Sequence, residues 1–353
     1  MATIRVFSTF NMLQAQEWDW QVTGHTPTSL VIEDVAASRK QTFTGTFTYN
    51  LAGQVSGTAT ATSFFENGSM VYRVTGLDHD ARALQDFAEA SGDTQETYAF
   101  VLSGNDNVIG SDEADTLCAY GGNDKIDGGL GDDDMLGGAG NDIYIVDNVR
   151  DRVFETTTRA SGVDAGGRDV VKASVNFKIG DFIERLTLTG DAAANGTGNG
   201  MDNVIIGNVA ANTLMGAGGA DALNGGGGND RLGGGAGRDT LTGGAGADTF
   251  DFNAVTDSGA TRVTWDVIKD FVNEQDKIDV STIDANSLVA GNQSFMYAGS
   301  GEWGVGEAGA GVLRFEVLAG GLVLYGNTDA DEAAEFSIFL AGVEFLEGAD
   351  LVL

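Results

Sequence analysis

The chain has 353 residues, of which 42% are hydrophobic, so it is long enough for two or three domains with apolar cores. Glycine contributes 53 residues and proline one, but the Gly-X-Y period of collagen is absent. Acidic residues outnumber basic ones 52 to 19, and the net charge of −33 repels nucleic acid and anionic membranes and attracts cations.

The first hundred residues predict a small, mostly antiparallel β domain. Strand-like runs include "TIRVFSTF", "SLVIEDV", "MVYRVTGL" and "ETYAFVL", and one short helix is expected within 79–90. In the hairpin over 41–65, threonines alternate with aromatic, glycine and alanine residues, which gives one threonine face. That face is either a solvated outer surface or a recognition surface for glycans, ice or a second copy. We expect the domain to cap the N-terminal end of the repeats that follow.

A nine-residue period occupies "LSGNDNVIGSDEADTLCAYGGNDKIDGGLGDDDMLGGAGNDIYIVD". Each aspartate on the period is followed two residues later by a large apolar side chain. The aspartates are Asp106, Asp115, Asp124, Asp133 and Asp142, and the apolar residues are Val108, Leu117, Ile126, Met135 and Tyr144. The single cysteine, Cys118, occupies a variable position, so we expect an inert surface thiol, with intermolecular pairing as the alternative.

A second array includes "GGAGRDTLTGGAGADTF" (234–250) and extends back to residue 203. Its phased polar residues are Asn203, Asn212, Asp221, Asp230, Asp239 and Asp248, and its apolar residues are Ile205, Leu214, Leu223, Leu232, Leu241 and Phe250. Because Asn203 and Asn212 carry neutral amides, we expect weak or empty ion sites there. The insert at about 149–190 contains strand-like runs, so we interpret both arrays as one interrupted solenoid; a real break would give two β-rolls.

Nine residues are too few for helical hairpins or propeller blades. Each unit holds a glycine-rich turn of six residues and a three-residue strand with one inward apolar side chain. Glycine provides the positive φ angles and the close backbone approach that such turns require. Two units make a coil of 18 residues, and successive coils stack as parallel strands about 4.8 Å apart. The repeats therefore predict a parallel β-roll with aspartate-bearing turns along two edges.

This stacking brings like charges together, for example Asp221 and Asp239, which is unfavourable without a cation. Carboxylate oxygens and glycine-turn carbonyls form an all-oxygen shell that suits Ca²⁺ better than Mg²⁺ or Zn²⁺. The alternative is a metal-free glycine-rich loop whose charge serves only solubility. The predicted calcium ligands are Asp106, Asp115, Asp124, Asp133, Asp142, Asp221, Asp230, Asp239, Asp248, Gly128, Gly137, Gly225, Gly234 and Gly243.

The units resemble the calcium-binding nonapeptide GGxGxDxUx of the RTX family. "GGAGRDTLT", "GGGGNDRLG" and "GGAGNDIYI" match every fixed position, whereas "GSDEADTLC" and "AYGGNDKID" lack glycines and are expected to bind more weakly. "DTFDFNAVTDSGATRVTWDVIKDFVNEQDKIDVSTIDA" and the tail "EFSIFLAGVEFLEGADLVL" resemble the C-terminal domain of serralysin-type secreted proteases. The similarity covers roughly residues 100–353 and implies that Asp270 lies near the last metal.

The resemblance also implies export by a type I secretion apparatus under an uncleaved C-terminal signal, with folding on external calcium. We see no cleaved N-terminal signal and no apolar stretch long enough to span a bilayer. Acid repulsion and glycine entropy oppose folding without calcium, so binding free energy becomes folding free energy. We predict an all-β chain with an N-terminal domain (1–100), a β-roll (101–252) and a β-rich C-terminal cap (253–353).

Three functions are compatible with this organisation. The first is a non-enzymatic, calcium-binding protein of the bacterial surface or matrix that self-associates as a surface layer or filament. The second is an adhesin whose N-terminal domain binds a surface glycan. The third is an enzyme with an unfamiliar active site in residues 1–100. No catalytic residues are predicted, because His25 and His79 lie outside any HExxH motif and neither GxSxG nor a P-loop is present.

Overall fold

The computed structural model describes residues 3–6, 21–26, 29–34, 39–49, 55–66, 69–80, 102–156, 162–300, 310–329, 331 and 333–353. Within these ranges the chain is all-β, as predicted, and its one helical element is the 3-10 turn η2 (Gly348–Asp350). The chain forms two compact units, Met1–Lys172 and Ala173–Leu353. The predicted domain boundaries, and the continuity of the two arrays, stay predictions.

The first unit begins with an antiparallel sheet. Consecutive strands pair from β2 to β6, and β1 pairs with β6 on one side and in parallel with β7 on the other. The strands are β1 (Thr3–Val6), β2 (Gln21–Thr26), β3 (Ser29–Asp34), β4 (Arg39–Tyr49), β5 (Val55–Glu66), β6 (Ser69–Asp80) and β7 (Asn107–Ile109). Strand β1 thus hydrogen-bonds to the edge of the first repeat strand, as the predicted cap requires. The expected helix lies, beyond Asp80, outside the described residues.

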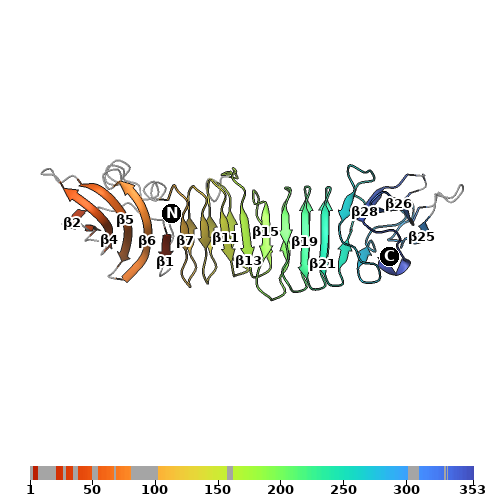
Figure 1. The fold of residues 1–353 in the computed structure, drawn as a ribbon, viewed down its shortest axis with the longest axis horizontal. Helices are drawn as coiled ribbons and strands as arrows, with labels where there is room; N and C mark the ends of the chain where they lie inside the picture. The colour runs from red at the N-terminus through yellow and green to blue at the C-terminus, as the bar shows by residue number, and fades with distance from the viewer. Residues whose placement is uncertain are drawn as a thin grey trace. The chain divides into compact units, whose positions relative to one another are not determined.

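The repeats of the first unit form two parallel ladders in which paired residues lie 18 positions apart, for example Val108 and Ile126 (Figure 1). One ladder contains β7, β9 (Lys125–Asp127) and β11 (Ile143–Val146). The other contains β8 (Thr116–Cys118), β10 (Asp134–Leu136) and β12 (Arg152–Phe154). Strand β12, from the start of the insert, continues its ladder although no strand was predicted there, and β13 (Val170–Ala173) lies within the predicted strand-like run 169–177.

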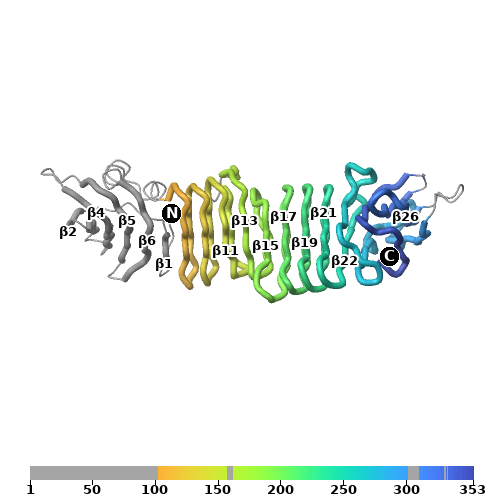
Figure 2. The backbone as a smooth tube through the Cα atoms, in the orientation of Figure 1, coloured from red at the N-terminus to blue at the C-terminus, as the bar shows by residue number. Residues whose placement is uncertain are grey.

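The second unit repeats this architecture, with coils that run side by side in green and cyan in Figure 2. One ladder contains β15 (Arg185–Leu188), β17 (Val204–Ile206), β19 (Ala222–Gly227), β21 (Thr240–Ala245) and β23 (Asp266–Ile268). The other contains β14 (Phe177–Lys178), β16 (Gly196–Thr197), β18 (Thr213–Gly218), β20 (Arg231–Ala236), β22 (Thr249–Asp251) and β24 (Lys277–Asp279).

A β-rich cap closes both ladders of the second unit. Strand β28 (Phe336–Ala341) pairs in parallel with β23, and β29 (Leu351–Val352) pairs in parallel with β24. Strand β27 (Gly321–Asn327) pairs antiparallel with both β28 and β26 (Val312–Leu318), and β25 (Met296–Ser300) joins β26. The ladder that ends in β23 and β28 is therefore covered by antiparallel strands, whereas β29 is the last strand of the other ladder among the described residues.

The core follows the nine-residue period. All eleven predicted apolar residues, from Val108 to Phe250, are at most 1% exposed. Each repeat strand thus buries its phased apolar side chain, as predicted, and some strands, such as β8 and β10, bury further residues. The prediction of a surface thiol is wrong, because Cys118 is only 3% exposed. Its strand, β8, is buried on both faces, so the alternation that places neighbouring residues in solvent does not apply there.

Candidate metal centre

The phased acids stack one coil above another, as predicted. In each stack, Oδ1 of an acid accepts a hydrogen bond from the backbone N–H of the acid or asparagine 18 residues earlier. The N···O distances are 2.6 Å for Asp106–Asp124, 2.8 Å for Asp115–Asp133, 2.7 Å for Asp124–Asp142, 2.7 Å for Asn203–Asp221, 2.7 Å for Asn212–Asp230, 2.7 Å for Asp221–Asp239 and 2.8 Å for Asp230–Asp248. The repeats thus fix each carboxylate by its first oxygen.

The second carboxylate oxygen is left without a donor. Among the described residues, Oδ2 is buried and accepts no hydrogen bond in Asp124, Asp133, Asp142, Asp221, Asp230, Asp239, Asp248 and Asp266. A buried anionic oxygen without a partner is strongly unfavourable, so such groups are paired with a cation or coordinate a metal. The arrangement therefore fits a bound cation at each of these turns.

The backbone of the first glycine of each turn packs directly against this oxygen. A Cβ atom on Gly225 would lie 2.5 Å from the carbonyl oxygen of Gly243 and even closer to Oδ2 of Asp230. The pocket beside Gly216 is likewise lined by Oδ2 of Asp221 and the Gly234 carbonyl oxygen. A side chain at these positions would displace the carboxylate and carbonyl oxygens, which are the ligand types that Ca²⁺ prefers.

The other predicted glycines behave in related ways. The Gly225 carbonyl faces the pocket beside Gly207, and the Gly128 carbonyl faces the pocket beside Gly110. At Gly137 the space is instead bordered by Oδ2 of Asp142 and the Tyr144 hydroxyl. The structure therefore brings all five predicted glycines to the turn pockets, with a distinct environment at Gly137.

Burial raises the pKa of the repeat acids, and neighbouring carboxylates raise it further at several positions, while the backbone hydrogen bond to Oδ1 lowers it. The resulting pKa is about 8 for Asp124, about 7 for Asp133 and Asp221, and about 6 for Asp142, Asp230 and Asp239. In the absence of a metal, the carboxyl of Asp124 therefore stays largely protonated near neutral pH, and those of Asp133 and Asp221 are partly protonated. A bound cation reverses this by favouring the charged form.

Asn203 and Asn212 occupy the carboxylate position of the repeat, and their side chains are hydrogen-bonded without an ion. Nδ2 of Asn203 donates to the Ile183 carbonyl at 3.1 Å, and Nδ2 of Asn212 donates to the Ala194 carbonyl at 2.6 Å. Oδ1 of Asn212 accepts the N–H of Asn208 at 2.8 Å. The amide N–H groups thus satisfy carbonyls of the preceding coil, which gives a physical reason to expect weak or empty sites there.

Asp115 differs from the other repeat acids. Its Oδ2 accepts hydrogen bonds from the backbone N–H and the hydroxyl of Ser111, at 2.7 and 2.8 Å. Ser111 belongs to the turn "GSDEAD", which lacks the second glycine of the repeat. Since this carboxylate already has two donors, the structure favours the weaker binding expected for this turn.

Asp270 lies beside the last repeat turn, as the resemblance implied. Its two oxygens accept the N–H groups of Gly243 and Gly244, each at 2.9 Å. Asp270 thereby orders the turn whose pocket holds Oδ2 of Asp248. Its role as a metal ligand stays a prediction.

Four further acids continue the stacks beyond the predicted set. Asp151, Asp169, Asp266 and Asp276 accept the backbone N–H of Asp133, Asp142, Asp239 and Asp248, at 3.0, 2.8, 2.8 and 3.0 Å. The first three fall on the same nine-residue period and could have been found by extending it. Asp276 is one residue out of phase, so the period alone does not reveal it.

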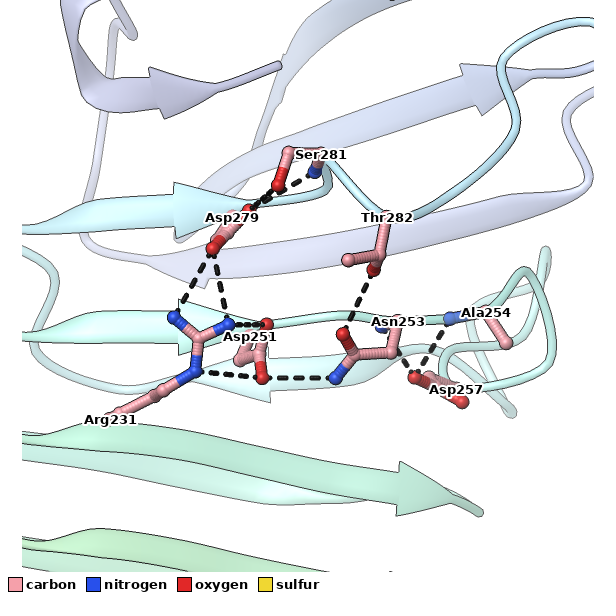
Figure 3. A network of polar contacts seen from close by, with 8 residues as sticks. All are labelled: Arg231, Asp251, Asn253, Ala254, Asp257, Asp279, Ser281 and Thr282. Carbon is pink, nitrogen blue, oxygen red and sulfur yellow. Dashed lines mark hydrogen bonds and ion pairs between the residues drawn. The ribbon is translucent and has the colours of Figure 1, made fainter. Parts of the chain in front are cut away.

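One acidic cluster carries its own cation (Figure 3). The Arg231 guanidinium bonds both oxygens of Asp251, at 2.6 and 3.0 Å, and Oδ2 of Asp279 at 3.2 Å. Burial alone would raise the pKa of Asp279, but hydrogen bonds from Ser281 and Arg231 outweigh it, so the pKa is lowered. Within the described residues, the repeat acids of the calcium turns have no arginine placed in this way, so a metal ion is the cation that could pair with them.

Comparisons with known proteins agree with this geometry. The family model described as "Peptidase M10 serralysin C terminal" matches residues 161–353, more than half of the chain. The chain belongs to this serralysin C-terminal family. The model for the RTX calcium-binding nonapeptide repeat matches this serralysin-type chain over 101–134 and 109–144. Its repeats therefore bind several calcium ions, and both matched regions are non-catalytic parts of serralysin-type proteins.

Similar solved structures come from enzymes or their subunits. Two are subunits of the Azotobacter vinelandii mannuronan C5-epimerase. AlgE6R3 is 33% identical, covers 43% of the serralysin-type chain and 78% of its own, and has a TM-score of 0.32. AlgE6R2 is 35% identical, covers 45% and 91%, and has a TM-score of 0.34. The extracellular lipase LipA from Serratia marcescens is 20% identical, covers 71% and 40%, and has a TM-score of 0.29.

Two further findings complete the comparison. A search of curated proteins found no significant match. In the part of the serralysin-type chain that the structure describes, no helix has the length and apolar character needed to cross a membrane. Absence of catalytic activity in the whole chain stays a prediction.

Proposed function

We propose that the chain is a secreted calcium-binding protein that folds on external Ca²⁺ and serves as a self-assembling structural protein of the cell surface or matrix. The observation that carries the calcium-dependent part is the set of buried carboxylate oxygens without donors. Burying these oxygens in a folded chain requires either protons or cations. At neutral pH and extracellular calcium concentrations, cations are the available partner.

The same observation supports a role for calcium in export. Extracellular calcium modules have dissociation constants of about 10⁻⁴ to 10⁻³ M, so cytosolic calcium leaves such sites empty. The chain would then stay unfolded inside the cell and pass through a type I secretion apparatus. The match to the serralysin C-terminal family supports this route.

Self-assembly rests on charge. Beyond the buried acids, the repeat turns carry exposed acids such as Asp112, Asp132 and Asp202. With a net charge of −33, copies of the chain repel one another until divalent ions bridge them. Calcium would therefore act twice, first within the turns and then between molecules.

Light scattering and electron microscopy of the purified full chain, titrated with Ca²⁺ from chelator to millimolar levels, test this proposal. Ordered sheets or filaments that appear with Ca²⁺ but not with Mg²⁺ are expected. Circular dichroism on the same samples separates folding from assembly. A chain that folds with calcium but stays monomeric at every concentration would exclude the assembling role and retain the calcium-dependent scaffold.

The N-terminal sheet supports a second candidate, an adhesin for surface glycans. Strands β4 and β5 pair along their length, from Arg39 with Glu66 to Tyr49 with Val55, so the threonine-rich segments form the predicted hairpin. Saturable binding of a glycan by the monomer, lost when Thr46 and Thr48 are replaced by Val, would favour this candidate. A monomer that binds no glycan on a broad array would exclude it.

A further inference from the structure

The first array ends in a turn that departs from the repeat. Phe154 of β12 pairs with Leu136 of β10, so Glu155 takes the place of the first glycine in the next unit, 18 residues after Gly137. The chain then doubles back, with an antiparallel bridge between Thr156 and Asp164 and a hydrogen bond from Ala165 N–H to the Glu155 carbonyl. Nine additional residues in the sequence thus separate Glu155 from the place where the stacking continues.

The regular stacking resumes after this excursion. The N–H of Gly140 donates to the Gly166 carbonyl at 2.9 Å, and the N–H of Asp142 donates to Oδ1 of Asp169 at 2.8 Å, across 27 residues instead of 18. Asp169 therefore fills the position that a repeat aspartate fills elsewhere, and Glu155 is an additional acid that the repeat does not contain.

Three carboxylates meet at this point. The ligand oxygens of Asp142, Glu155 and Asp169 all lie within 4.8 Å of one another, and the three residues are 0%, 1% and 1% exposed. Oδ2 of Asp142 is buried and accepts no hydrogen bond. The Tyr144 hydroxyl donates to Oε1 of Glu155, and a Cβ on Gly137 would collide with both this hydroxyl and Oδ2 of Asp142.

We propose that Asp142, Glu155 and Asp169 form a three-carboxylate site for a hard divalent cation at the end of the first array, with Tyr144 holding the Glu155 side chain. Its composition differs from that of the nonapeptide sites, because the third carboxylate comes from outside the repeat. A Tyr144–Glu155 hydrogen bond accounts for one oxygen of Glu155, but not for Oδ2 of Asp142.

The charge of this three-carboxylate site predicts how its calcium affinity compares with that of the nonapeptide sites. Three carboxylates carry a formal charge of −3, and affinity of oxygen sites rises with the number of charged ligands. This site is therefore expected to fill first as calcium rises, and it is independent of the role proposed for the whole chain.

The first test compares Glu155→Gln with Glu113→Gln in the full chain, by equilibrium dialysis and calorimetry with Ca²⁺. Glu113 is an exposed acid of the same unit, so its variant matches the change of charge. We expect Glu155→Gln to weaken the tightest site about ten-fold or more, or to lose one ion, while Glu113→Gln binds as the parent does. Equal ion number and affinity in Glu155→Gln and the parent would overturn the site.

A second test with terbium can be used even if Glu155→Gln does not fold. Terbium binds such oxygen sites and is excited through a nearby tyrosine, so the parent chain should show sensitised emission at the first equivalents of Tb³⁺. Tyr144→Phe removes the hydroxyl and keeps the ring buried, as Phe250 is in the second array. We expect this variant to lose the early emission while still binding Ca²⁺. Early emission unchanged by the substitution would place the tightest ion elsewhere.

Discussion

Replacing Gly225 by alanine tests whether the close approach of two oxygens to this glycine is needed for ion binding. Gly225 does not adopt a positive φ, so its backbone suits alanine. The new Cβ would collide with Oδ2 of Asp230 and the Gly243 carbonyl oxygen and would displace these predicted calcium ligands. Gly227 in the same strand is the matched control, because it also lacks a positive φ and its nearest neighbours would be 3.7 Å from a Cβ.

The expected effect follows from the ion that is lost. With a dissociation constant of about 10⁻⁴ M, about 10 mM Ca²⁺ is 100 times the constant and stabilises the fold by about 2.7 kcal/mol per ion. Gly225→Ala should lose most of this and bind one ion fewer. Gly227→Ala should be neutral or more stable by about 0.4–1 kcal/mol, because alanine reduces the entropy of the unfolded chain.

Urea unfolding followed by circular dichroism at about 10 mM Ca²⁺ measures the difference in unfolding free energy at a concentration well above the expected constant. Ion counting by equilibrium dialysis on the same variants reports whether the site is gone. If Gly225→Ala binds the full number of ions and unfolds with Gly227→Ala, the pocket beside Gly225 holds no ion and the assignment of these glycines is wrong.

Three further predictions concern the same unit or its acids. Asp230→Ala should lower the free energy of unfolding more with Ca²⁺ than in chelator, where only the hydrogen bond from the Asn212 N–H is lost. Asn212→Ala should lower it equally with and without Ca²⁺, because its side-chain amide bonds need no ion; equal calcium affinity in both variants would contradict the assignment. In chelator, the pKa values of Asp124 and Asp221 are raised in the folded state, so the folded state binds more protons than the unfolded state between about pH 4 and pH 8. Stability should therefore fall as pH rises through this range, and circular dichroism should show more β structure at pH 5 than at pH 8. Equal β structure at both pH values would refute this. Arg231→Met should destabilise the fold by about 1 kcal/mol or more at every calcium concentration, because Asp251 loses its cation. The control Arg238→Met, at an exposed position, should not destabilise the fold. A loss of stability in thermal melts that depends on calcium would argue against a purely structural role for the Arg231 ion pairs.

Much of the fold and site could be predicted because the period is strict. A nine-residue spacing fixes which side chain points inward and which acid lies above which, so the stacks and the core residues follow from counting alone. Asp151, Asp169 and Asp266 stand on the same period but lack the flanking glycine pattern, and they were missed for that reason. Extending the count would have found them.

The rest depends on chain lengths between repeats that no local pattern encodes. Glu155 becomes a candidate ligand only because the chain makes an excursion before Asp169, and Asp276 joins its stack across 28 residues instead of 18. Likewise, the burial of Cys118 depends on what covers the second face of β8. Counting along the period fails where a loop changes length, because the loop then decides which residue occupies the next stacking position.

The orientation of one carboxylate has a consequence for how the array comes apart. Oδ1 of Asp230 bonds the backbone of Asn212 in the preceding coil, while Oδ2 lies in the pocket of its own turn, beside the Gly243 carbonyl of the following coil. The Asp230 side chain therefore contacts or faces three successive coils, its own and the ones before and after it. Such a stack behaves as a one-dimensional zipper with nearest-neighbour coupling, in which a vacancy loosens the layers on both sides. Calcium should therefore leave the array in runs, with each departure making the adjacent ion easier to remove.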